Sequence, residues 1–224
     1  GETLADLGIN LDLAPVVDVN VNPDNPAIGK LDRSFSPDPE KVARQAKAFI
    51  QGLHEQGALS CLKHFPGHGS AWNDSHYGVT DITTTWSDKE LLPYRRLMAQ
   101  GLCDSIMTGH LFNARLDSQL PATLSGPTIK GLLRQDMGYN GVVISDDLQM
   151  KAIRGHYKLE ETVLLSVKAG VDILLFGNNL EYDPEIAGKV NSLLIKLVRE
   201  GKLAKSRISE SYKRIMRLKQ RLEF

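Results

Sequence analysis

A short stretch of the chain brings together imidazole, ammonium and carboxylate side chains. Residues 63–69 read Lys-His-Phe-Pro-Gly-His-Gly, and Asp74 and His76 follow them. The apolar run from Ala58 to Leu62 precedes the stretch, so these polar groups come where a buried strand is expected to end. Loops that follow parallel strands often hold catalytic groups, because the strands fix their positions. The pattern therefore predicts a site of proton transfer and ligand binding.

Carboxylates follow two other expected strands. Asp18 comes at the end of one apolar run, and Asp146 and Asp147 come directly after the strand expected at 142–144. Groups at the carboxyl ends of parallel strands should converge on one mouth of a sheet or barrel. Glycosidic bond cleavage requires one carboxylate that attacks the anomeric carbon or activates water, and one donor that protonates the leaving oxygen. These residues could supply that pair.

Three cationic or imidazole side chains are candidates to bind sugar hydroxyls. Lys63, His64 and Arg33 could do so through charge-assisted hydrogen bonds. For Arg33 a surface salt bridge is an equal alternative, because its loop is long. His68 is expected to be structural and to bond within its own turn. His110 is expected either to be a satisfied core histidine or to line the mouth.

The elements that must position these groups alternate between strand and helix patterns. Parallel strands joined by helical crossovers define the α/β class. Five such units suit an open doubly wound sheet and are few for a closed eight-stranded barrel, and periodicity does not choose between the two. Strands are expected at 9–19, 58–62, 105–108, 142–144 and 173–176, and helices at 39–53, 87–100, 125–138, 159–169, 185–200 and 206–222.

Several helix starts carry cap patterns. Asp38 precedes Pro39, which predicts an N-cap followed by proline at the first helical position. Ser87 has Glu90 three residues later, which is the form of a capping box. We expect Asp147 to cap the helix that follows it, which leaves its neighbour for chemistry. The charges between 202 and 219 are expected to form a solvated helix face.

Composition sets limits on the function. The 224 residues are 42% hydrophobic, and 27 basic and 27 acidic side chains give a formal net charge of zero. This balance gives no reason to expect a nucleic acid or an anionic membrane as a partner. No apolar run approaches the roughly 20 residues that span a bilayer. Cys61 and Cys103 are expected to be small buried side chains rather than a disulfide.

Several motifs together resemble one enzyme family. Residues 63–69, Asp74-Ser75-His76 and residues 145–150 (Ser-Asp-Asp-Leu-Gln-Met) closely resemble the third family of glycoside hydrolases. The match is to its β-N-acetylglucosaminidase branch, which includes bacterial enzymes of cell-wall recycling. The resemblance extends over nearly the whole chain, and further support comes from residues 14–19, 32–35 and 121–125.

The resemblance implies a retaining β-N-acetylglucosaminidase. It implies that Asp146 is the nucleophile that forms a covalent glycosyl intermediate, that His76 is the general acid/base, and that Asp74 holds the His76 ring. Histidine suits that role because its pKa of ~6.5 lets one ring give a proton and later take one back. A carboxylate beside it can fix the tautomer. Because histidine does not repel an anion, phosphorolysis stays open as a variant, as does β-glucosidase activity.

The resemblance also implies the substrate. Lys63, His64 and Arg33 match residues that contact the N-acetylglucosamine ring of a glycan or muropeptide, and no cofactor is expected. A zinc site is disfavoured, because Lys63 places a positive charge beside it and the spacing fits no compact motif. Its ligands would be His64, His68, His76 and Asp74.

The fold that the resemblance implies is a (β/α)8-like TIM barrel. The chain matches this barrel from about its third strand, so we expect residues 1–224 to be one catalytic domain that lacks the first two β/α units. The sequence is expected to be a fragment, whose compartment and oligomeric state stay open. A natural truncation would expose strand edges, which a dimer could close. The alternative function is a non-catalytic glycan-binding protein that has kept the loops.

Overall fold

A parallel sheet lies at the centre of the chain. The computed structural model describes residues 1–75, 78–179 and 182–222, so the expected general acid/base His76 lies outside the described residues. Strands β1 (Cys61–Phe65), β3 (Ser105–Thr108) and β5 (Val142–Ser145) form the sheet in that order. Cys61 pairs with Ser105, and Ile106 pairs with Val143.

Two extended segments continue this sheet without forming regular strands. The first expected strand pairs with the β1 side at only two isolated bridges, Leu11 with Leu59 and Val16 with Lys63. Pro15 lies between them and has no N–H to donate, which interrupts the ladder. On the other side, Ile173 forms a bridge with Ile144. The α/β class is thus confirmed, whereas the closed barrel is not: the described strands form an open three-stranded sheet and a separate two-stranded one.

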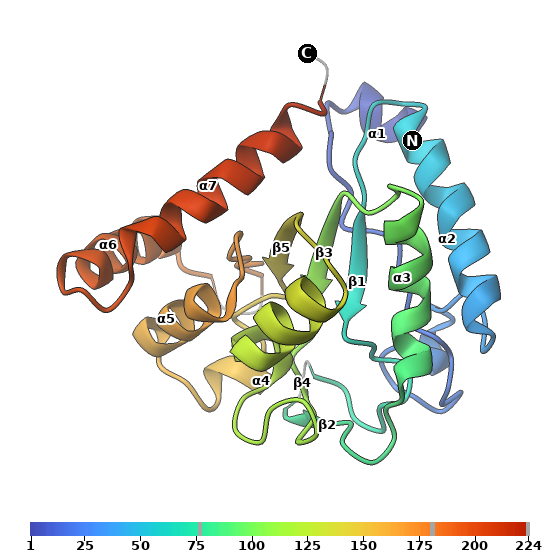
Figure 1. Ribbon diagram of the computed structural model, residues 1–224, viewed down its shortest axis with the longest axis horizontal. Helices are drawn as coiled ribbons and strands as arrows, with labels where there is room; N and C mark the ends of the chain where they lie inside the picture. Colours follow the sequence, from blue (N-terminus) through green and yellow to red (C-terminus); the bar gives the residue numbers. More distant parts are fainter. Residues whose placement is uncertain (76–77, 180–181, 223–224) are drawn as a thin grey trace.

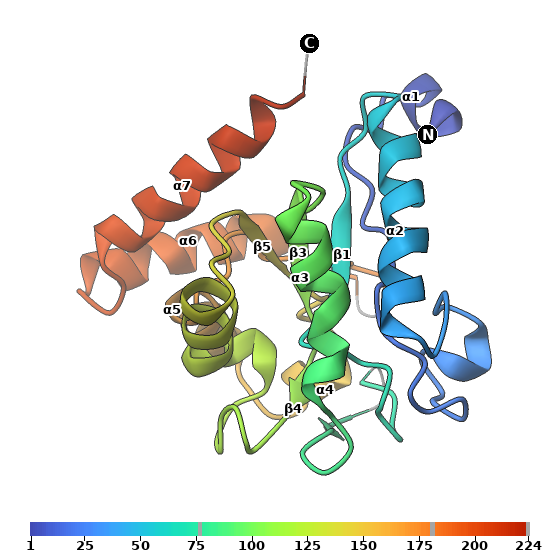
Figure 2. The ribbon, with the colours of Figure 1, turned by 45° about the vertical axis from the view of Figure 1, so that its right-hand side comes forward.

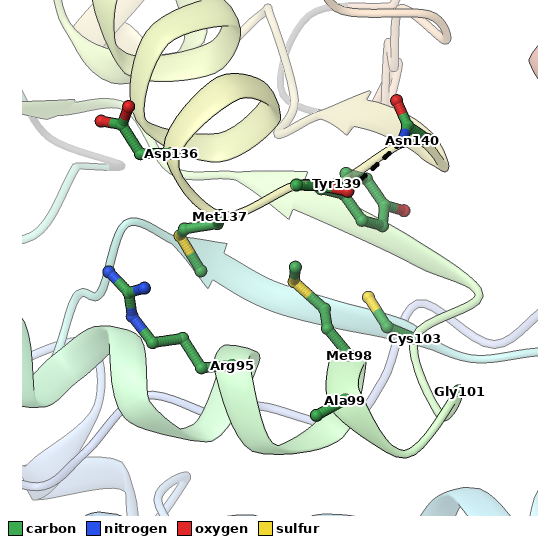
Figure 3. Close-up of a pocket in the computed structure, with 10 residues that line it drawn as sticks. Arg95, Met98, Ala99, Gly101, Cys103, Asp136, Met137, Tyr139 and Asn140 are labelled. Carbon is green, nitrogen blue, oxygen red and sulfur yellow. Dashed lines mark hydrogen bonds between the residues drawn. The ribbon is translucent and has the colours of Figure 1, made fainter.

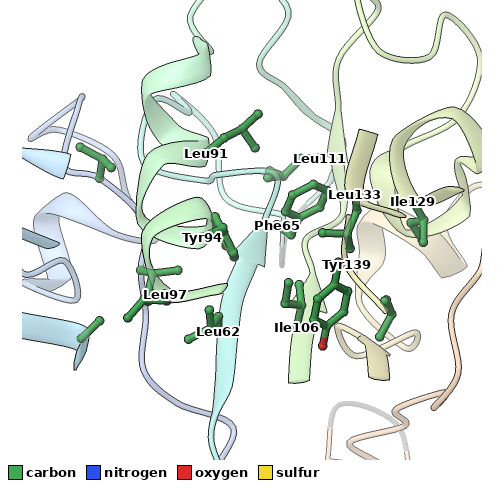
Figure 4. Close-up of a cluster of buried hydrophobic side chains, with 14 of the residues drawn as sticks. Leu62, Phe65, Leu91, Tyr94, Leu97, Ile106, Leu111, Ile129, Leu133 and Tyr139 are labelled. Atoms are coloured by element: carbon green, nitrogen blue, oxygen red, sulfur yellow. The ribbon is translucent and has the colours of Figure 1, made fainter. Parts of the chain in front are cut away.

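Helices pack on the side of the sheet that carries the larger core. They are α2 (Pro39–His54), α3 (Leu92–Ala99) and the helical segment η4 (Pro127–Asp136). Leu62, Ile106 and Val143 point into this core, and Phe65 meets Tyr94 of α3 edge to face, with ring centroids 5.4 Å apart (Figure 4). Figure 2 shows α2 and α3 running side by side along β1.

The alternate strand residues point to the opposite face. Cys61, Met107 and Ile144 form a smaller cluster there with Leu218 of α7 (Lys205–Lys219). This alternation follows from the two-residue period of a strand. A third cluster joins α5 (Leu159–Ala169) to α6 (Ile186–Arg199). Figure 1 shows α6 and α7 on the far side of the sheet from α2.

Short elements complete the described fold. Gly8 follows the end of α1 with a φ of 71°. Cys61 and Cys103 are both free; Cys61 is buried, as predicted, whereas Cys103 is half-buried. In the described ranges, no helix is both long enough and apolar enough to cross a bilayer. The short elements are α1 (Glu2–Asp6), η1 (Gly29–Leu31), β2 (Thr80–Asp81), η2 (Asp88–Leu91), β4 (Leu111–Phe112), η3 (Ala122–Leu124) and α4 (Lys151–Arg154).

One predicted cap is confirmed and another is wrong. The Asp38 carboxylate accepts a hydrogen bond from the Glu40 N–H at 2.9 Å, at the start of α2. Ser87, in contrast, makes no side-chain cap. Glu90 is fully buried and accepts from the Ser70 N–H at 3.3 Å. The capping box fails because Glu90 turns toward the stretch at 63–70 rather than toward its own helix.

The expectation of a solvated face on α7 is wrong for two of its arginines. Arg207 and Arg214 bind the buried carboxylate of Asp172, Arg207 at 3.2 Å and Arg214 at 2.9 Å. Arg134 of η4 joins the same carboxylate at 2.9 Å. Burial would raise the pKa of Asp172, but its hydrogen bonds and the arginine charges hold it below its usual value. This cluster ties α7 to the amino-terminal side of the sheet.

Candidate functional site

Asp18 is the carboxylate that organises the site. It is fully buried and accepts from His64 Nδ1 at 2.8 Å and from the His68 backbone N–H at 2.7 Å. Burial would raise the pKa of Asp18, but the neighbouring His64 and His68 hold it below its usual value. Because an ionised carboxylate only accepts, Nδ1 of His64 carries a proton. Nε2 is therefore the ring nitrogen that His64 can offer to a ligand.

The loop after β1 approaches its neighbours so closely that two positions require glycine. A Cβ atom at Gly69 would lie 1.6 Å from the Val19 carbonyl oxygen. Gly67 has a φ of +125°, and a Cβ there would lie 2.6 Å from the Glu90 Cβ. The glycines of the stretch therefore let the loop pack against the end of the first extended segment, which places the His68 N–H on Asp18.

The asparagine-rich loop from 20 to 39 clamps the same stretch. Asn25 donates from its side-chain amide to the His68 carbonyl at 2.6 Å, and Asn22 donates to the Ala71 carbonyl at 2.9 Å. Both asparagines are buried. Sequence analysis missed this role, because these partners lie more than 40 positions away and the loop has no periodic pattern.

His68 makes the contacts expected of a structural residue. Its ring is buried, and Nε2 lies 3.4 Å from the Ser75 hydroxyl within the same loop. Burial lowers the pKa of His68, while the carboxylates of Asp18 and Asp146 act in the opposite direction. His68 follows β1 and Asp146 follows β5 of the same parallel sheet, so both residues lie at the carboxyl ends of its strands.

Asp146 directly follows β5, and two hydrogen bonds with backbone groups fix its position. Its N–H donates to the Thr108 carbonyl of β3 at 3.1 Å, and its carboxylate accepts from the Asp147 N–H at 2.8 Å. The carboxylate is half-buried. These bonds fix the position of the side chain at the carboxyl ends of the strands.

Asp147 does not cap a helix, contrary to the prediction. Its carboxylate accepts from the N–H groups of Gln149 and Gly177, both at 3.0 Å. Helix α4 begins only at Lys151, with Met150 at its N-cap, so Asp147 lies too far back to reach the first turn. It instead tightens its own turn and links that turn to the segment after Ile173.

His110 is a satisfied buried histidine. Its Nε2 lies 2.8 Å from the Asp147 carbonyl, and its Nδ1 lies 2.8 Å from the Thr123 hydroxyl. Burial lowers the pKa of His110, despite the charge of Asp146. Nε2 donates the hydrogen bond to Asp147, because a carbonyl oxygen can only accept. It supports the backbone beside Asp146.

The other predicted residues take varied places. Lys63 is half-buried in the middle of β1, and Asp74 is half-buried in the loop beyond the strand. Arg33 donates to the Ala27 carbonyl at 2.8 Å, which closes its own loop. His76 cannot be placed, since it is outside the described residues. Within the described part of the chain, no three His, Cys, Asp or Glu side chains cluster as metal ligands.

A cavity of about 430 Å³ lies away from this site (Figure 3). Met98 of α3 and Met137 point into it, with Arg95 and Asp136 at its border. Cys103 also lines it and comes just before β3, so the cavity is at the amino-terminal end of the strands. None of the predicted site residues lines it.

Comparisons with known proteins agree on one family. The family model described as "Glycosyl hydrolase family 3 N terminal domain" matches residues 1–218. "Beta-hexosaminidase LpqI" from Mycobacterium tuberculosis is 40% identical over 98% of this chain and 56% of the relative. "Beta-hexosaminidase A" from Pseudoalteromonas piscicida is 34% identical over 99% of this chain and 40% of the relative.

Solved structures give the same picture. A glycoside hydrolase family 3 β-N-acetylglucosaminidase from Paenibacillus sp. str. FPU-7 matches with a TM-score of 0.91 and 37% identity, over 99% of this chain and 41% of that chain. A β-N-acetylhexosaminidase from Beutenbergia cavernae matches with a TM-score of 0.89 and 29% identity, over 97% of this chain and 64% of that chain. The chain thus spans about half the length of the curated relatives it matches.

Proposed function

Because the chain belongs to glycosyl hydrolase family 3, we propose that it carries the active site of a retaining β-N-acetylglucosaminidase. Its similarity to named β-hexosaminidases and to a family 3 β-N-acetylglucosaminidase supports this activity. The observation that carries the proposal is the convergence of strand ends. The Asp18–His64–His68 cluster lies at the end of β1, and Asp146 follows β5 of the same parallel sheet, so both lie at the carboxyl ends of its strands.

In the proposed reaction Asp146 is the nucleophile. Its carboxylate bonds to the anomeric carbon while the bond from that carbon to the leaving oxygen breaks, and the leaving oxygen takes a proton from His76. Water then attacks the same carbon, gives its proton to His76 and releases Asp146. Two displacements retain the β configuration. The Asp147 N–H, which donates to the Asp146 carboxylate at 2.8 Å, orients the nucleophile.

The remaining assignments are part of the proposal. Asp74, two residues before His76, would hold the His76 ring in one tautomer. His64 would bind a sugar hydroxyl through Nε2, because Asp18 occupies Nδ1. Lys63 and Arg33 would contribute further contacts to the N-acetylglucosamine ring. The substrate would be a terminal N-acetylglucosamine of a peptidoglycan-derived or related β-glycoside.

We also infer that these strands belong to a (β/α)8 barrel. The parallel segments follow one another in chain order, from the segment at 11–17 through β1, β3 and β5 to Ile173. Consecutive parallel strands with outer helices are the arrangement of a (β/α)8 barrel. In such a barrel the loops at the carboxyl ends of the strands form the active site, which is where Asp18 and Asp146 lie.

Turnover of p-nitrophenyl N-acetyl-β-glucosaminide by the purified chain tests the function. We expect hydrolysis, and a loss of at least about a thousand-fold in kcat for Asp146→Asn, since a nucleophile acts only in the chemical steps. Asp136→Asn, at the remote cavity, is the matched control and should keep the rate. Folded protein that binds N-acetylglucosamine without turnover would favour the glycan-binding alternative. Formation of a sugar 1-phosphate in phosphate buffer would identify a phosphorylase.

A further inference from the structure

The segment that leads into α3 holds the loop after β1 at several points. Trp86 donates from its indole Nε1 to the Pro66 carbonyl at 2.9 Å, and the Glu90 carboxylate accepts from the Ser70 N–H at 3.3 Å. A Cβ atom at Gly67 would lie 2.6 Å from the Glu90 Cβ, so the turn packs directly on this side chain. The segment therefore contacts the loop at three successive places.

Glu90 stands on a rigid support. Leu91 and Tyr94, which follow it, are buried in the larger core, and Figure 4 shows both in the core that also contains Phe65. The Glu90 side chain itself has no exposed surface. Burying a carboxyl group is costly, and an apolar side chain would fill such a place more favourably. The contribution that a carboxyl group can make here is its contact with the loop.

A second carboxylate, from a different element, holds the same loop. Asp18 accepts from the His68 N–H at 2.7 Å and from His64 Nδ1 at 2.8 Å. The two carboxyl groups thus bind backbone N–H groups that are only two residues apart, those of His68 and Ser70. Asp18 fixes His64, which belongs to the proposed sugar-binding set. Glu90 contacts residues of the turn that come after His64.

The turn that Glu90 supports leads to the proposed dyad. Asp74 comes four residues after Ser70. Ser75 is buried, and its hydroxyl lies 3.4 Å from His68 Nε2, so the segment around Asp74 folds back onto the turn. A displaced turn would therefore displace Asp74. His64, in contrast, lies within β1, which its pairing with β3 and the bond to Asp18 hold in place.

We propose that Glu90 is a positioning residue for the acid/base step: through Gly67 and Ser70 it holds the loop that presents Asp74 and His76, and it takes no part in binding the sugar. The inference rests on the proposed function, because it takes Asp74 and His76 as the dyad. It separates two supports of one loop, with Asp18 serving the sugar and Glu90 serving proton transfer.

Ionisation of Glu90 should weaken this support. Burial raises the pKa of Glu90 to about 7, and the negative charge of Asp18 acts in the same direction. Tyr94, the other titratable group that acts on Glu90, stays neutral, because burial raises its pKa well above the usual value. A charged Glu90 would be drawn toward water and repelled by Asp18. The loop should therefore be held best while Glu90 is neutral.

The kinetics of Glu90→Ala test the proposal. The kcat for p-nitrophenyl N-acetyl-β-glucosaminide should fall at least about tenfold, because the dyad acts in both displacements. The Kd for N-acetylglucosamine, measured by calorimetry, should stay within about twofold. Glu90→Gln keeps the shape and the acceptor oxygen and should retain the native kcat at pH 6. Glu40→Ala removes an exposed carboxylate on α2 and should change neither quantity.

A comparison across pH isolates the ionisation of Glu90. His76 titrates in both proteins, so the ratio of kcat for Glu90→Gln to kcat for the native chain removes its effect. The ratio should be near one at pH 6 and about ten at pH 8, where about nine-tenths of Glu90 is ionised in the native chain. A ratio of one at both pH values would contradict the release of the loop on ionisation.

Hydrogen exchange followed by peptide mass spectrometry locates the change without any turnover. In Glu90→Ala the amide hydrogens of residues 67–75 should exchange at least about tenfold faster, while those of β1 keep their rates. Gly67→Ala pushes the turn away from Glu90 and should give the same pattern even if Glu90→Ala does not fold.

Three results would overturn the proposal: a native kcat in Glu90→Ala, a parallel loss of kcat and sugar affinity, or faster exchange throughout β1. A native chain that does not turn over the glycoside, together with faster exchange confined to residues 67–75 in the variants, would instead contradict the proposed function and leave Glu90 as the support of the loop.

Discussion

Glu90 is a buried carboxyl group whose ionisation should oppose folding. The side chain has no exposed surface, and its carboxylate accepts a hydrogen bond from the Ser70 N–H at 3.3 Å. Burial raises the pKa of Glu90 from 4.5 to about 7. The folded state therefore keeps the proton across a pH range in which the unfolded chain has released it.

The sign and size of the effect follow from this difference. Between pH 4.5 and about 7 the folded state binds the extra proton, so the free energy of unfolding falls as the pH rises through this window. A shift of this size corresponds to about 3 kcal/mol. Glu90→Gln has nearly the same shape but no charge, and its amide oxygen can still accept from Ser70. At pH 8 the variant should be more stable than the native chain by up to about 3 kcal/mol.

Urea unfolding at pH 4.5 and at pH 8 measures this effect. The gain from Glu90→Gln should be small at the lower pH and large at the higher one. Glu40→Gln is the matched control, because Glu40 is exposed and pairs with Arg96 on the surface. It should change the free energy of unfolding by less than about 1 kcal/mol. A Glu90→Gln variant with no gain at pH 8, or with equal gains at both pH values, would refute the reasoning.

Three further predictions concern residues that hold the site and the sheet. Gly69→Ala should lower the free energy of unfolding, measured by urea denaturation, by at least about 2 kcal/mol, because the added methyl group would meet the Val19 carbonyl. At Gly188 on α6 an added methyl group meets no neighbouring atom, so Gly188→Ala is the control and should raise the free energy of unfolding by about 1 kcal/mol. Asp172→Asn should lower the free energy of unfolding by about 3 kcal/mol, because Arg134, Arg207 and Arg214 lose the buried carboxylate that they share. Thermal unfolding measures the change, and an unchanged Tm would contradict this prediction. Asp18→Asn should lower the free energy of unfolding by about 3 kcal/mol at pH 7. Because the pKa of Asp18 is lowered in the folded state, that cost should shrink in acid as the native carboxylate takes up a proton, and a cost that is constant with pH would contradict the assignment.

Local patterns in the sequence predicted the elements and the strand ends well. The helix that starts at Asp38 and Pro39 is where the cap pattern places it, and the expected strands at 105–108 and 142–144 form the sheet. These features depend on neighbours in the chain, namely on periodicity and on caps. For the same reason Asp18 and Asp146 could be recognised as groups at strand ends.

Contacts between distant segments could not be predicted in this way. Glu90 has the spacing of a capping box but is buried against Ser70, and Arg207 looks like a surface charge but binds Asp172, 35 residues away. The link from Asn25 to His68 spans 43 positions. In each case the partner is set by tertiary packing, which periodicity does not report.

The most direct test of the central claim is to trap the proposed covalent intermediate. A fluorinated N-acetylglucosaminyl inactivator slows the second displacement, so the sugar should stay bonded to the nucleophile, and peptide mass spectrometry locates it. We predict a single modification on Asp146 that is absent from Asp146→Asn. A label on a different residue, or turnover that proceeds with Asp146 unmodified and replaceable by Asn, would contradict the account.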